Sequence, residues 1–177
     1  MVTHVSETHH DERATLLAFV EAQRGAIRRT LLGLTEEQAA SRPSASELSL
    51  SGLVKHAAET ELNWLRMAQR QPNEKARTQE TWGDSFRLVG DETVPGMLAF
   101  WDGVVAETEK FIRSVPDLED TFPLPEAPWF PKEAEVSMRW LLVHLVEETA
   151  RHAGHADIIR ESLDGKTAFE LIAESRK

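Results

Sequence analysis

The chain has 177 residues, 41% of them hydrophobic and 28% charged, and no cysteine, which excludes disulfides, thiolate metal sites and a cysteine nucleophile. Its net charge of −10 argues against a nucleic-acid partner, because contact with a phosphate backbone requires a basic surface. No apolar run approaches the length of a membrane span and the polar N-terminus does not resemble a signal peptide, so we expect one cytoplasmic domain over residues 1–177.

The first half of the chain predicts two long helices. Residues 1–10 are polar and are expected to form a frayed, disordered tail. Apolar residues then recur at helical spacing over residues 11–34, and a capping-box pattern beginning at Thr35 predicts a short helical turn. After a serine-rich linker, a second long helix is predicted over residues 50–69. His56 points inward on this helix, where a lone histidine is more often a hydrogen-bonded core residue than a metal ligand.

A polar, turn-rich loop is predicted over residues 70–90, with Trp82 and Phe86 as its expected hydrophobic anchors. A loop of this length in a compact domain is usually either functional or poorly ordered. The third long helix is predicted over residues 93–115, because Pro95 suits the first turn of a helix and apolar residues then recur at helical spacing.

Residues 122–135 contain four prolines, which exclude a regular helix there. This segment is long enough to cross one end of a bundle, where Trp129 and Phe130 can pack over whatever lies beneath. The last long helix is predicted over residues 137–164, antiparallel to the one before it, and residues 167–175 can add a short terminal helix. Four long helical patterns without a convincing strand predict an all-α protein, a four-helix bundle.

The helix at residues 137–164 carries an unusual polar stripe. His144, Glu148, His152 and His155 share one face, because side chains four, four and three residues apart on an α-helix lie on the same side. The rest of that face is apolar, and burying polar groups without partners costs several kcal/mol. A metal ion would be such a partner, and a buried polar network is the alternative.

Helix geometry limits which of these side chains can share one ion. His144 and His152 lie about 12 Å apart along the helix axis, which is too far for a common ligand set. Three pairs stay open: His144 with Glu148, Glu148 with His152, and His152 with His155. With His56 added from the second helix, Glu148 and His152 complete two imidazoles and one carboxylate. That set matches zinc sites with open positions and the facial triad that binds ferrous iron.

Three stretches resemble a known family: LLGLTEEQAASRPSASELSLSG, SGLVKHAAETELNW and HLVEETARHAGHADIIRESLDG. They resemble the DinB/YfiT-like superfamily of metal-dependent four-helix-bundle enzymes, in a branch related to the N-terminal domain of mycothiol-dependent maleylpyruvate isomerase. The resemblance implies an up-down-down-up bundle with a long crossover connection. It also implies a metal held by His56, Glu148 and His152. Many members have histidine in place of Glu148, and many have glutamine in place of His155.

The resemblance further implies a low-molecular-weight-thiol S-transferase or isomerase that uses mycothiol or bacillithiol. We expect zinc as the metal, with nickel, iron or manganese as alternatives, an electrophile as the second substrate, and a homodimer. A stress-related metal sensor without turnover and a metal-dependent hydrolase are alternative functions. Further candidates to support the ligands or line a pocket are His155, His144, Asn63, Thr60 and Arg160.

Overall fold

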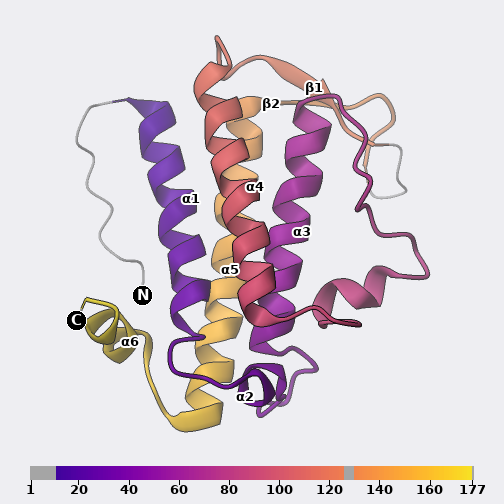
Figure 1. Cartoon of the computed structure of the whole chain (residues 1–177). Coiled ribbons are helices and arrows are strands. Elements are labelled where there is room, and N and C mark those ends of the chain that lie inside the picture. The colour runs from indigo at the N-terminus through magenta and orange to yellow at the C-terminus, as the bar shows by residue number, and fades with distance from the viewer. Residues whose placement is uncertain (1–10, 126–129, 177) are drawn as a thin grey trace.

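Four long helices form the body of the molecule in a computed structural model that describes residues 11–125 and 130–176 (Figure 1). The expectations for residues 1–10 and for Trp129 lie outside the described residues. The bundle helices are α1 (Glu12–Arg29), α3 (Leu50–Ala68), α4 (Val94–Ser114) and α5 (Met138–Asp164). The shorter elements are α2 (Glu36–Ala40), the 3₁₀ helix η1 (Trp82–Phe86), β1 (Thr121–Pro123), β2 (Glu135–Ser137) and α6 (Ala168–Glu174).

The bundle has the predicted up-down-down-up order. In Figure 1, α1 and α5 run in one direction and α3 and α4 run in the other. Because α3 and α4 are parallel, the chain between them must return along the whole length of the bundle, and residues 69–93 make this long connection. The proline-rich connection between α4 and α5 crosses one end, so α5 is antiparallel to α4 as predicted.

Side-chain caps fix where the long helices begin. Asp11 accepts a hydrogen bond from the backbone N–H of Arg13, and Ser49, Thr93 and Ser137 cap α3, α4 and α5 in the same way. At the other end of α5, Gly165 has a φ of 79°, the left-handed conformation that favours glycine as a helix stop. These caps fix the beginnings of α3, which carries His56, and of α5, which carries the polar stripe.

Three sequence expectations are wrong in detail. The first helix ends at Arg29 and not at residue 34, because the chain turns over residues 30–33 and Gly33 adopts a φ of 72°. A strand was not expected, but β1 and β2 form a short antiparallel pair in the proline-rich connection. Trp82 is 59% exposed and is no anchor, whereas Phe86 packs against α3.

The core fills the interior between the helices. One cluster of buried side chains lies near the two strands and includes Phe122 and Leu141, both fully buried. A second cluster lies further along α3 and α4 and is centred on Trp101. No helix among residues 11–125 and 130–176 is long and apolar enough to cross a membrane.

Candidate metal centre

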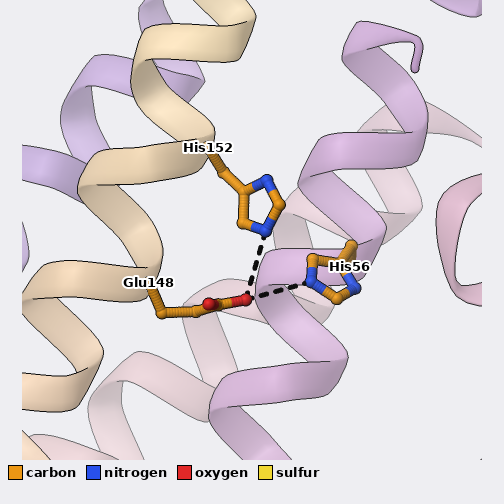
Figure 2. Close-up of side chains that lie close together, drawn as sticks. All are labelled: His56, Glu148 and His152. Carbon is orange, nitrogen blue, oxygen red and sulfur yellow. Dashed lines mark hydrogen bonds and ion pairs between the residues drawn. The ribbon is translucent and has the colours of Figure 1, made fainter. Parts of the chain in front are cut away.

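His56, Glu148 and His152 meet between two helices. His56 projects from α3 towards α5, where Glu148 and His152 lie one helical turn apart on the facing side (Figure 2). Nε2 of His56 lies 3.2 Å and Nε2 of His152 lies 3.1 Å from the same atom, Oε1 of Glu148. The three candidate ligand atoms all lie within 4.8 Å of one another. Two imidazoles and a carboxylate therefore converge on one point.

Glu148 is ionised in this arrangement. Hydrogen bonds from His152 and His56 hold the pKa of its carboxyl well below the usual range, and they outweigh burial, which acts in the opposite direction. His56 and His152 are only 6% and 8% exposed, whereas a quarter of the Glu148 side chain is exposed. The cluster is thus shielded on the histidine side and open to solvent at the carboxylate.

Two rings fix the orientation of His56. Phe86 from η1 stacks on the imidazole with centroids 4.1 Å apart and planes 19° apart. The His152 ring meets it edge-on at 4.7 Å and 76°. Thr60, one turn further along α3, places its Oγ1 3.5 Å from Nε2 of His56. The sequence offered Thr60 as a neighbour of His56, but the contact with Phe86 was missed because it depends on the path of the loop.

The donor set fits a divalent cation. Two imidazole nitrogens and one carboxylate oxygen are ligands that zinc and ferrous iron accept, and three protein ligands leave positions open. In addition, Nδ1 of His152 is buried without a hydrogen-bond partner among the described residues. Because His152 would hold a metal through Nε2, this Nδ1 atom does not decide the question, and the fit rests on the convergence of the two Nε2 atoms with Oε1 of Glu148. The residues present are therefore suited to hold a metal.

A pocket of about 230 Å³ opens beside His56. It lies between α3, the long connection and the proline-rich segment. Its lining mixes aromatic rings with hydroxyl, amide and guanidinium groups, among them Thr60, Asn63, Asn73, Arg77, Trp82 and Phe130. Asn73 donates a hydrogen bond to Asn63 across the pocket wall, at 3.3 Å. This lining suits a small molecule with both apolar and hydrogen-bonding parts.

The other two histidines of the stripe lie apart from the cluster. His144 stacks on Trp140, with centroids 4.9 Å apart, and meets Trp64 edge-on at 4.5 Å. Burial lowers its pKa, which favours the neutral ring in this aromatic setting. The His155 ring lies 5.5 Å from the His152 ring, and burial lowers its pKa as well. Neither belongs to the group of atoms that converges on Glu148.

Arg160 does not reach the pocket for which the sequence made it a candidate. It is 1% exposed and donates hydrogen bonds to the backbone carbonyls of Thr30 and Leu32, at 2.6 and 2.9 Å. Its guanidinium also pairs with Asp164. A cation at this position stabilises the C-terminal end of α1, where unpaired carbonyls gather. Arg160 is therefore part of the framework.

Comparison with known proteins identifies the family. A family model described as mycothiol-S-transferase matches residues 15–165. The chain belongs to the mycothiol-S-transferase family. This is a DinB/YfiT-like family, so the resemblance seen in the sequence is confirmed. The matched range contains His56, Glu148 and His152.

The fold of this chain also resembles a solved structure. A conserved protein from Enterococcus faecalis matches with a TM-score of 0.69 and 16% sequence identity, over 89% of this chain and 100% of that chain. At this level of identity the likeness shows the fold alone. No curated protein matches the chain.

Proposed function

We propose that the chain is a divalent-metal-dependent transferase that joins the sulfur of a low-molecular-weight thiol to an electrophile. The thiol would be of the mycothiol or bacillithiol type. The observation that supports this most strongly is the convergence of His56, Glu148 and His152 in a member of the mycothiol-S-transferase family. Because the sequence contains no cysteine, the sulfur must come from a cosubstrate.

His56 and His152 would hold the metal through Nε2 and Glu148 through Oε1. With one carboxylate, the site would carry a formal charge of +1, and zinc is the metal we expect, with nickel, iron or manganese as alternatives. A divalent ion bound there lowers the pKa of a coordinated thiol towards neutrality and so supplies a thiolate.

The residues around the site would bind and orient the two substrates. The pocket beside His56 offers Trp82 and Phe130 for apolar contact and Thr60 and Asn63 for hydrogen bonds. In the transfer, the sulfur contributes the electron pair of the new bond to the electrophile. The leaving group departs with the electron pair of the bond that breaks, and the thiol proton passes to solvent. Phe86 covers one face of His56 and keeps water from it.

Metal content and thiol binding test the proposal. Untagged protein is analysed for metals, reloaded with cobalt and titrated with mycothiol, bacillithiol and glutathione. We expect one bound ion per chain and a shift of the visible cobalt bands with mycothiol or bacillithiol, because sulfur would then coordinate the ion. A variant with His4, His9 and His10 changed to alanine is the control against adventitious binding by the N-terminal histidines.

Each outcome of this experiment has a definite meaning. No bound metal overturns the proposal and leaves the three side chains as a buried polar network. A bound metal without response to any thiol favours a sensor without turnover or a metal-dependent hydrolase. The homodimer implied by the family resemblance stays a prediction, which light scattering checks independently of the metal.

A further inference from the structure

The His56 side chain is held by a part of the chain that is distant in sequence. Phe86 lies thirty residues further on, in η1, and this short helix packs beside α3 (Figure 1). Its ring stacks on the imidazole almost in parallel, and the His152 ring closes the perpendicular side. A ring held by two others at different angles has little freedom to rotate about χ2, so Nε2 stays directed at Glu148.

The backbone of Phe86 rests directly on α3 at Gly52. A Cβ at position 52 would overlap the Phe86 carbonyl oxygen and lie 2.7 Å from its carbonyl carbon. Contacts under 3.0 Å are essentially never formed by real Cβ atoms, and here the opposing atoms are backbone. Any side chain at this position would therefore push Phe86 away from the helix. Gly52 lies one helical turn before His56, so the contact fixes the phenyl ring at the level of the imidazole.

Ion pairs fasten the same loop on both sides of Phe86. Arg77 donates through Nε to Glu59 at 2.9 Å, and Lys55, which is fully buried, pairs with Glu92. Lys55 and Glu59 flank His56 on α3. The helical turn that carries the candidate ligand is thus also the turn to which residues 77–92 are attached.

We infer that Phe86 is a positioning residue for His56, held in stacking contact by a backbone approach that glycine at position 52 permits. The inference rests on the proposed function, because the direction of Nε2 matters most when it binds a metal. A loose imidazole would spend part of its time pointing elsewhere and would bind the ion more weakly.

Zinc affinity of four variants tests this positioning role. Phe86→Leu removes the ring and Gly52→Ala displaces it, whereas Phe86→Tyr keeps it. Phe100→Leu is the matched control, since Phe100 on α4 contacts Lys75 of the same loop but does not contact His56. Affinity for zinc alone is measured by competition with a chromophoric chelator. We expect Phe86→Leu and Gly52→Ala to bind about 10–100-fold more weakly, the usual cost of losing support around a ligand.

The two conservative variants, Phe86→Tyr and Phe100→Leu, should keep the wild-type affinity. Circular dichroism and thermal unfolding check that each variant is folded. If Phe86→Leu does not fold, the zinc affinity of Gly52→Ala tests the positioning role instead. Wild-type affinity in both Phe86→Leu and Gly52→Ala would overturn the inference. An equal loss in Phe100→Leu would also overturn it, because the effect would then be general loosening of the loop.

A metal-free measurement separates failure of this inference from failure of the proposed function. If the wild-type chain binds no metal, the proposed function fails, and the long-range ¹H–¹⁵N spectrum of the imidazole nitrogens still reports which nitrogen of His56 carries the proton. We expect the Nε2–H form in the wild type and in Phe100→Leu, and a mixture of both forms in Phe86→Leu. An unchanged Nε2–H form in Phe86→Leu would overturn the positioning role.

Discussion

Two carboxylates of the bundle, those of Glu61 and Glu148, lie in very different surroundings. Glu61 is 3% exposed and accepts hydrogen bonds from Nε and Nη2 of Arg24, at 3.0 and 2.6 Å, and from Nε1 of Trp101 at 2.9 Å. Glu148 accepts from two imidazoles through one oxygen, and a quarter of its side chain is exposed. We call Arg24, Glu61 and Trp101 the closed cluster, because its side chains are buried. We call His56, Glu148 and His152 the open cluster, because solvent reaches Glu148. In the open cluster, Nδ1 of His152 has no hydrogen-bond partner among the described residues.

The difference between the two clusters follows from the chemistry of their cations. A guanidinium is permanently protonated and has no lone pair to offer, so Arg24 can only donate hydrogen bonds, which it does to Glu61 and Glu21. An imidazole can lose its proton and present a lone pair to a metal. A buried carboxylate with arginine and tryptophan donors is therefore a structural element, whereas one with two imidazole donors can become a binding site.

The largest expected effect is on the closed cluster. Glu61→Gln leaves the fully buried Arg24 with only the exposed Glu21, 3.3 Å from its Nη1, as a carboxylate partner, and breaking a buried ion pair costs up to about 3–5 kcal/mol of folding free energy. Urea unfolding of the metal-free protein measures this loss, and zinc affinity of the folded fraction should not change. The triple variant Arg24→Met, Glu61→Leu and Trp101→Phe should regain much of the stability, because it removes the buried charges and also the Trp101 N–H that Glu61 accepts. A loss below about 1 kcal/mol in Glu61→Gln would show that the cluster is not the structural element described above.

Replacing glutamate by glutamine in the open cluster should weaken zinc binding strongly and reduce folding stability only slightly. Glu148→Gln keeps the size of the side chain but removes the anionic ligand, so we expect zinc to bind at least about a hundredfold more weakly. The metal-free protein should lose only about 1 kcal/mol, because solvent reaches Glu148. Chelator competition and urea unfolding on one preparation give both values. If stability falls as far as in Glu61→Gln while zinc affinity is kept, the roles of the two carboxylates have been assigned wrongly.

Helical periodicity allowed most of the fold and the open cluster to be predicted. The stripe of His144, Glu148 and His152 follows from the 3.6-residue repeat alone, as does the inward direction of His56. The choice of Glu148 and His152 with His56 came from the family resemblance, and the structure brings those three side chains together. Local chemistry also allowed the capping box at Thr35, which begins α2, to be predicted, because capping depends on residues within one turn.

Contacts between distant segments could not be predicted. Arg24, Glu61 and Trp101 come from three helices, and periodicity does not show that two charged residues on separate helices face each other across the core. Phe86 reaches His56 through a loop whose path is set by ion pairs and by Gly52. The strands β1 and β2 have three residues each, too few for an alternating pattern to be visible.

A smaller effect should follow from loss of one donor in the closed cluster. Trp101→Phe removes the N–H that Glu61 accepts, in a position with 0% exposure, so we expect a loss of about 1–3 kcal/mol. Trp64→Phe is a control for the change in volume, since Trp64 is also buried and packs on Trp140. Urea unfolding compares the two variants. Equal losses would mean that volume, and not the bond to Glu61, accounts for the effect of Trp101→Phe.

The smallest expected effect is the response of the open cluster to acid. The pKa of Glu148 is lower in the folded chain than the ordinary value of 4.5, because His152 and His56 donate to its carboxylate. The unfolded chain therefore binds a proton first as pH falls, so this group stabilises the fold above about pH 4.5 and its contribution is lost progressively below that value. We expect the metal-free wild type to lose on the order of 1 kcal/mol more than Glu148→Gln between pH 5 and pH 3.5. Urea unfolding across that range measures the difference. Parallel pH profiles for the two proteins would show that the bonds to Glu148 do not stabilise the carboxylate in solution.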